Sequence, residues 1–145
     1  MDAHPQLTAA GNARFVRKFD ERGNEIETSF FGIHGKPVMN VYRIHRSTAA
    51  YDTFGNEIDS ARFGVSGEPI LNHSGYHREE TIFDGRGHKM EQKWFGVDGT
   101  AVINTNKDFG AASCTWSSND RGQITETRRF GLDGALINGA GGWTR

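Results

Sequence analysis

The stretch FFGIHGKPVMN at Phe30–Asn40 decides the fold, because three further versions of it follow along the chain. These are RFGVSGEPILN at Arg62–Asn72, WFGVDGTAVIN at Trp94–Asn104 and RFGLDGALIN at Arg129–Asn138. A catalytic site needs to be built only once, whereas a repeat at a fixed period indicates supersecondary units that stack on one another. The repetition therefore favours architecture or multivalent binding.

Two independent sets of residues give the length of the repeat. The Phe-Gly pairs are spaced by 32, 32 and 35 residues, and they begin at Phe31, Phe63, Phe95 and Phe130. The glycines of an upstream turn have the same spacing, and they are Gly23, Gly55, Gly87 and Gly122. The extra residues of the third step fall in the third connection. There we expect Thr105–Ala112 to form an exposed loop that tolerates shortening.

Each unit holds two strand-like runs joined by a glycine turn. In the run EIETSFF of the first unit, Ile26, Thr28 and Phe30 would lie on one face and the intervening residues on the other. In two units a second turn contains Asp-Gly, a strong hairpin signal because both residues tolerate positive φ. No glycine-free amphipathic stretch is suited to a long helix. The sequence therefore predicts an all-β fold of four β-hairpin repeats of about 32 residues.

We expect one repeat domain over 1–145, divided into a partial leading unit at 1–13 and units at 14–45, 46–77, 78–112 and 113–145. Both ends of the chain fall in the middle of the pattern, as expected of four permuted units or of a segment of a longer array. A single hairpin cannot bury its own face, so the hairpins should stack into a twisted sheet or solenoid. The alternative is a closed barrel or propeller-like ring, which removes the exposed edges.

The composition restricts the classes of partner. The 17 basic and 18 acidic residues are dispersed and give a formal net charge of −1, so we expect no nucleic-acid partner. No apolar run approaches the roughly 20 residues of a membrane helix, so we expect no membrane insertion. The first residues have neither the charged leader nor the apolar segment of a signal peptide. The compartment stays open, and a cell-surface or secreted parent protein is compatible with these features.

The stretches FDERGNEIETSFFG and YDTFGNEIDSARFG resemble the YD-type repeats of bacterial Rhs and related surface or toxin-shell proteins. In that family the aromatic-Asp pair closes a strand and Gly-Asn shapes the hairpin turn. The resemblance covers about half of each unit, because typical YD repeats lack the second half with the pattern FGxxGxPxxN. It implies a hairpin array that forms a spiralling sheet and serves as a shell, stalk or carrier.

Two histidines are candidate ligand-contacting residues. His45 and His77 are 32 residues apart and each precedes an arginine, so they could form equivalent metal or anion sites. The equivalent Ala13 and Ala112 lack an imidazole, and no second ligand keeps a metal-like spacing. The alternative is a pair of surface or strand-edge histidines. We therefore expect no metal and no cofactor.

A second candidate site is the row of residues that precede the repeated phenylalanines. Adjacent residues on a strand face opposite ways, so a buried phenylalanine row would leave this row exposed. Aromatic and arginine side chains at fixed spacing suit stacking on sugars or docking of a protein. The alternative is that the row packs on a second sheet. Its members are Phe30, Arg62, Trp94 and Arg129.

Cys114 is the only cysteine and could be a nucleophile, but no nearby residue is identified as its base, and a small buried thiol is the simpler interpretation. We therefore expect no enzyme activity. The sequence predicts a structural or binding repeat module from a larger bacterial surface or toxin-associated protein, with a protein or glycan partner or further repeats of a longer chain. The alternative is a carbohydrate-binding, lectin-like domain with repeated sites.

Overall fold

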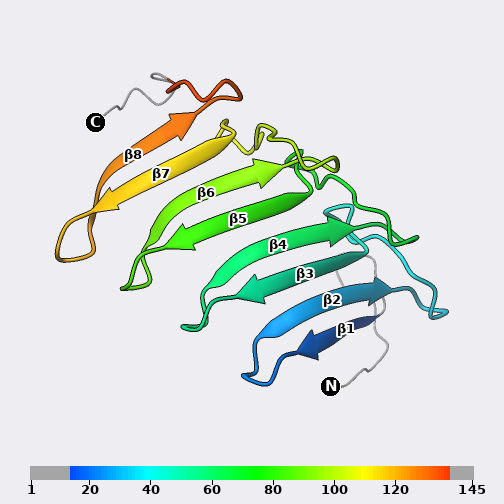
Figure 1. Ribbon diagram of the computed structural model, residues 1–145. Coiled ribbons are helices and arrows are strands. Elements are labelled where there is room, and N and C mark those ends of the chain that lie inside the picture. Colours follow the sequence, from blue (N-terminus) through cyan, green and yellow to red (C-terminus); the bar gives the residue numbers. More distant parts are fainter. Residues whose placement is uncertain (1–13, 138–145) are drawn as a thin grey trace.

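The computed structural model describes residues 14–137, which form one open antiparallel sheet (Figure 1). The strands follow one another in sequence order across the sheet. They are β1 (Arg14–Phe19), β2 (Glu25–Phe31), β3 (Arg46–Tyr51), β4 (Glu57–Phe63), β5 (Arg78–Phe83), β6 (Lys89–Phe95), β7 (Ser113–Ser118) and β8 (Ile124–Phe130). The leading unit at 1–13 and the last part of the fourth unit lie outside the described residues.

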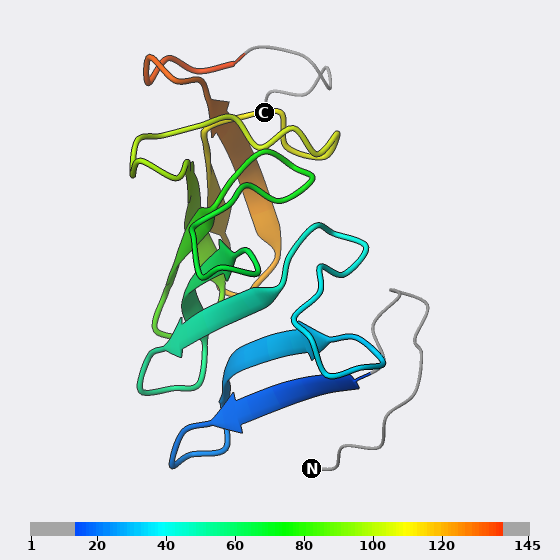
Figure 2. The same cartoon turned by 90° about the vertical axis from the view of Figure 1, so that its right-hand side faces the viewer.

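The all-β hairpin architecture is confirmed, and the closed alternative is wrong. Within 14–137, β1 pairs only with β2 and β8 pairs only with β7, so the two edges do not meet. Figure 2 shows the reason, because the sheet twists strongly between its first and last hairpins. Right-handed twist accumulates from strand to strand and here carries the edges apart. No helix among the described residues is long and apolar enough to cross a membrane.

One side chain holds the tip of each hairpin. Asp20 Oδ1 accepts hydrogen bonds from the backbone N–H groups of Arg22 (2.8 Å) and Asn24 (2.9 Å). Gly23 adopts a φ of +87° and donates its own N–H to the Asp20 carbonyl, a conformation that favours glycine. Asp52, Asp84 and Asn119 accept the corresponding bonds at the later tips. The Asn119 amide oxygen therefore replaces a carboxylate in the fourth unit without loss of the turn.

These turns should make the stability of the protein fall in acid. The backbone N–H of Asn56 lowers the pKa of Asp52, and equivalent bonds lower the pKa of Asp20 and Asp84. Carboxyls with a depressed folded pKa contribute stability above their unfolded pKa of about 3.9, and this contribution is lost as the pH falls through the folded value. Replacing all three by Asn should flatten this acid limb in urea unfolding at successive pH values. An unchanged acid limb would contradict the assignment.

The register defines two faces of the sheet, because directly paired residues lie on the same face. We call one the loop-covered face, since connections between the hairpins fold over it. The rings of Tyr76 and Phe109, both from connections, lie with their centres 6.3 Å and 4.9 Å from that of Trp94. Paired residues of this face include Ser47 with Arg62, Glu79 with Trp94, and Cys114 with Arg129.

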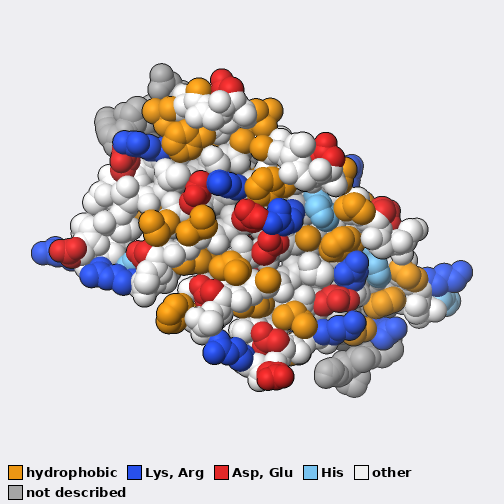
Figure 3. Space-filling model, in the orientation of Figure 1, with side chains coloured by type: hydrophobic (Ala, Val, Ile, Leu, Met, Phe, Trp, Pro, Cys, Tyr) orange, Lys and Arg blue, Asp and Glu red, His pale blue; other side chains and the backbone are white. Residues whose placement is uncertain are grey.

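The opposite face, here called the charged face, carries arginines stacked on the repeated phenylalanines. The Arg46 guanidinium carbon lies 4.1 Å from the centre of the Phe63 ring, and Arg14 and Arg78 cover Phe31 and Phe95 in the same way. Arg78 also forms an ion pair with Asp59 at 3.0 Å. Figure 3 shows one side of the molecule, on which acidic, basic and apolar side chains are interspersed.

We expected the repeated phenylalanines to be buried and the residues that precede them to be exposed. This expectation is wrong. The repeated phenylalanines are half-buried, three of them beneath arginines, whereas Trp94 is fully buried. Trp94 forms the core with Ala111 and Cys114. Strand alternation separates the two faces but does not say which one is covered. Here the cover comes from the connections and not from a second sheet.

The third connection is only partly the exposed loop that its extra length suggested. Residues 105–108 are exposed, but Ala111 and Ala112 are buried and the Phe109 ring packs on Trp94. The backbone N–H and the hydroxyl of Thr105 both donate to the Ser74 carbonyl, which attaches the connection to the preceding one. The insertion therefore supplies part of the core, and shortening it beyond its exposed residues would remove that part.

Candidate ligand-binding groove

The four residues of the candidate row share the loop-covered face, but the connections occupy them. The Trp94 indole N–H donates to Glu79 Oε2 at 2.8 Å. The Arg62 guanidinium carbon lies 4.8 Å from the centre of the Tyr76 ring, and Arg129 donates to the Phe109 carbonyl at 2.9 Å. Phe30 is half-buried. The interpretation of Trp94 as an exposed binding anchor is therefore wrong, because a buried indole offers no surface to a ligand.

The two candidate histidines lie where one hairpin joins the next. His45 Nδ1 lies 3.2 Å from the Val38 carbonyl oxygen, and its ring meets the Phe31 ring edge-on at 5.4 Å. His77 Nδ1 lies 2.8 Å from the carbonyl oxygen of Arg62, and its ring packs on Phe63 in the same manner. Nδ1, which faces the carbonyl, donates its hydrogen, and Nε2 is the ring nitrogen that keeps a lone pair. Residues 14–137 contain no group of three or more His, Cys, Asp or Glu placed to hold a metal ion.

A groove of about 160 Å³ opens between the first two hairpins. β2 and β3 pair over three residue pairs, from Glu27 with Thr48 to Ser29 with Arg46, as at the two later junctions, so the side chains at this junction leave the groove open. Toward the tips these strands have no ladder, and Tyr51 bridges the gap by donating its hydroxyl to the Glu25 carbonyl at 2.7 Å. The polar lining comprises Glu25, Glu27, Thr28, Ser47, Thr48, Tyr51, Glu57, Ser60 and Arg62.

Two groups in the groove have unused hydrogen-bonding capacity. Ser60 is only 6% exposed, and its hydroxyl has no hydrogen-bond partner among the described residues. Partial burial raises the pKa of Glu57, and the charges of Glu79 and Glu25 raise it further. A buried hydroxyl without a partner is destabilising. The groove therefore offers a polar ligand an unpaired hydroxyl and a carboxylate.

The same arrangement is not repeated at the next junction. There Gln92 stands at the position of Ser60, Trp94 at that of Arg62 and Lys89 at that of Glu57. Gln92 Nε2 donates to the Thr81 hydroxyl at 3.2 Å, and the Trp94 ring is buried under the connections. Larger side chains fill this second site.

Sequence reasoning missed the groove because Glu57 and Ser60 resemble ordinary strand residues. The available signal was a difference between units. Glu25 and Glu57 occupy equivalent positions in the first two units, whereas Lys89 and Ile124 occupy the same position in the last two. Departures from a repeat mark places where the units differ in surface chemistry.

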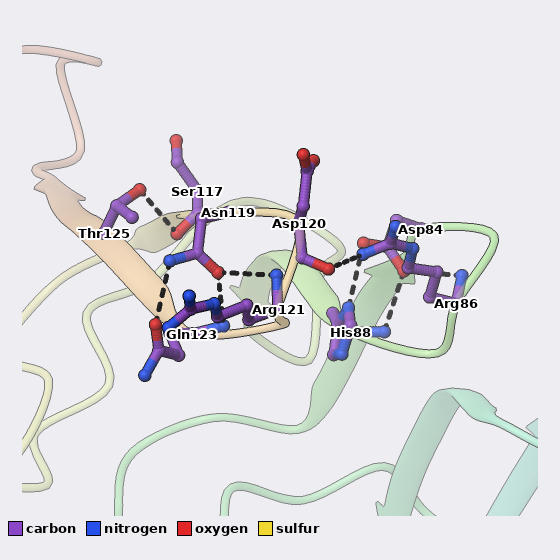
Figure 4. A network of polar contacts seen from close by, with 9 residues as sticks. All are labelled: Asp84, Arg86, His88, Ser117, Asn119, Asp120, Arg121, Gln123 and Thr125. Atoms are coloured by element: carbon purple, nitrogen blue, oxygen red, sulfur yellow. Dashed lines mark hydrogen bonds and ion pairs between the residues drawn. The ribbon is translucent and has the colours of Figure 1, made fainter.

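The hairpin tips form a second polar region, and Figure 4 shows its part at the third and fourth tips. Arg86 of the third tip donates to the Asp120 carbonyl of the fourth at 2.8 Å, and Arg22 reaches Thr53 in the same way at 2.6 Å. At the intervening position of the second tip stands Phe54, whose side chain is exposed. These contacts link neighbouring tips, and the region therefore has a structural explanation.

Cys114 should be unreactive in the folded protein. It is 1% exposed, and burial raises its pKa to about 11. Because the thiolate is the reactive form, we expect modification by an aromatic disulfide reagent at pH 8 to be at least about a hundredfold slower than in the unfolded chain. Absorbance at 412 nm with and without denaturant measures this. Equal rates in the two states would show that the thiol is accessible.

Comparison with known proteins adds no family to this picture: no protein-family model matches the sequence, and no curated protein matches it either.

Proposed function

We propose that this chain is a non-catalytic structural and binding repeat module, a segment of a larger bacterial surface or toxin-associated protein. One observation carries the proposal: four hairpins of the same design are joined edge to edge in one sheet. Three equivalent backbone bonds join them, from Phe30 to His45, from Arg62 to His77 and from Trp94 to Ala112. Such an array extends a surface by repetition.

The burial of the Cys114 thiol supports a non-catalytic role. The Cys114 thiol lies in the core, and His45 and His77 each hold Nδ1 against a backbone carbonyl. A general base or a nucleophile must reach a substrate with a free lone pair. The groove between the first hairpins instead offers hydrogen-bonding groups and a ring at a partly open surface.

A carbohydrate-binding role is the second candidate, and the groove favours it. Carboxylates of Glu25 and Glu57 could accept hydrogen bonds from sugar hydroxyls beside the Tyr51 ring. Aromatic faces and paired acceptors are the usual means of binding sugars in water. In this form the lectin-like alternative has one site at the first junction, since the lining changes in the later hairpins.

A glycan array and amide NMR titration of the whole chain test the proposal. We expect a ligand found in this way to shift the amides of β2–β4 on the loop-covered face, with no turnover of chromogenic ester or glycoside substrates. Glu91→Gln, on the charged face of β6, serves as the matched control that should bind as the wild type does. Substrate turnover by the wild-type protein that Glu57→Gln or Ser60→Ala abolishes would contradict a non-catalytic role.

A further inference from the structure

We propose that the groove between the first two hairpins binds a primary alkylammonium group, as carried by a diamine or by a lysine side chain. This inference rests on the proposed binding role and names the ligand chemistry of that groove. The groove lies on the loop-covered face between β2, β3 and β4.

The charges of the lining select a cation. On this face two carboxylates line the groove, from Glu25 and Glu57, against one guanidinium, from Arg62, whereas Glu27 pairs in register with Lys18 and Thr48 on the charged face. The Arg62 guanidinium is engaged elsewhere, because it lies over the Tyr76 ring of the connection and donates to the Ser60 carbonyl of β4 at 3.3 Å. An anion would meet net repulsion here, whereas an ammonium group would relieve the repulsion between carboxylates.

The carboxylates differ in how far they are already neutralised. Glu25 lies 3.4 Å from Arg17, and Glu27 lies 3.7 Å from Lys18. Within the described part of the chain Glu57 forms no ion pair and accepts no hydrogen bond; Glu79 and Glu25 act on it as like charges, and Arg62 acts on it as an opposite charge. Glu57 is therefore the carboxylate that is left for an incoming cation.

Ser60 provides the second, independent indication of a ligand. Its hydroxyl oxygen is buried, has no partner in 14–137 and lines the groove. An ammonium group has three N–H donors and no acceptor, so it suits acceptors such as the Glu57 carboxylate and this hydroxyl. The Tyr51 ring adds a face that attracts a cation, and Ile26 and Ala49 add apolar surface for the alkyl chain.

The size of the groove limits the ligand. At about 30 Å³ per water, 160 Å³ holds roughly five waters, which suits a short alkylammonium chain and excludes an oligosaccharide from full enclosure. Farther along the sheet, the loop-covered face already holds an ammonium group that belongs to this chain. Lys89, which stands at the position equivalent to Glu57, places its Nζ 5.6 Å from the centre of the Trp116 ring.

Isothermal titration and amide NMR of the full chain test this inference with defined probes. The probes are 1,4-diaminobutane, Nα-acetyl-lysine amide and butylamine at pH 7, with 1-butanol as the neutral control of similar shape. We expect the three amines to shift the amides of β2–β4 and 1-butanol to leave them unchanged. The tighter of the first two probes distinguishes a free diamine from a lysine side chain as the source of the group.

Substitutions assign the binding to the named side chains. Glu57→Gln keeps the shape and removes the charge, so it should weaken amine binding at least tenfold, and Ser60→Ala should weaken it about threefold. Glu91→Gln is the control and should bind as the wild type does. If Glu57→Gln does not fold, the comparison of butylamine with 1-butanol on the wild-type protein still decides the question.

Three results would overturn the inference. They are equal binding of butylamine and 1-butanol, amine binding that Glu57→Gln leaves unchanged, and no amine-dependent shift in β2–β4. A sugar that binds in the groove when amines do not would overturn the ligand class while supporting the proposed binding role. Failure of every probe in the glycan and protein screens would count separately against the binding role itself.

Discussion

Replacing Trp94 by alanine should lower the free energy of unfolding by about 3–5 kcal/mol, the range for removing a large buried side chain. The indole is 0% exposed, lies between the rings of Tyr76 and Phe109, and donates to Glu79. The substitution would leave a cavity between strand and connections and would also leave the Glu79 carboxylate without this donor. Urea unfolding followed by circular dichroism measures the loss.

Phe63→Ala is the matched control, because Phe63 stands in the second hairpin one position beyond Arg62 as Phe95 follows Trp94. Its ring is half-buried between Arg46 and His77, so we expect a smaller loss of about 1–2 kcal/mol. Trp94→Phe should fall between the two alanine variants. A loss below about 1 kcal/mol for Trp94→Ala would show that the connections do not form a core over this face.

Removing the fourth hairpin should cost far more stability than removing the first. A chain that ends at Asn104 loses Phe109, Ala111 and Cys114, which surround Trp94, and we expect it to be unfolded at 25 °C. A chain that begins at Arg46 keeps this cluster and should fold with a lower melting temperature. Repeat arrays lose stability in steps that depend on the interface removed, and the interfaces here are unequal.

Thermal unfolding by circular dichroism compares the two truncated chains. Equal loss of stability in both would contradict the unequal distribution of core along the sheet. The intact chain, measured at the same concentration, provides the reference. Refolding after dilution from urea distinguishes an unfolded chain from an aggregated one.

The hairpins could be predicted from the sequence because their determinants are local. Asp20, Gly23 and Asn24 lie within five residues and form hydrogen bonds with one another. The same pattern returns at each tip. Even the departure at Asn119 keeps the acceptor that the turn requires. A short sequence pattern can predict structure where its local preferences agree with the overall fold, as they do in these turns.

The sequence could not predict which face of the sheet is covered, because the covering residues are distant in sequence from the strands. Tyr76 and Phe109 cover the loop-covered face from connections that have no regular periodicity. Alternation along Lys89–Phe95 places Trp94 and Phe95 on opposite faces, but it does not indicate which of the two faces is covered. The open edges depend on accumulated twist, which no single unit encodes.

The groove was missed for a related reason. All three junctions between hairpins have three residue pairs, so the groove results from the side chains that meet between β2, β3 and β4 and not from the pairing alone. Among residues 14–137, no donor or acceptor forms a hydrogen bond with the Ser60 hydroxyl. A sequence shows a serine at this position but not the lack of a partner for it.

Amide hydrogen exchange by NMR tests most directly the central claim that four hairpins are joined edge to edge in one open sheet. The backbone N–H groups of Phe30, Arg62 and Trp94 donate across the three junctions and should exchange slowly. Alternate amides of β1 and β8 that point away from their paired strands should exchange quickly. Slow exchange along both edge strands would indicate a closed sheet, and fast exchange at the three junction amides would indicate separate hairpins. Either result would contradict the fold described here.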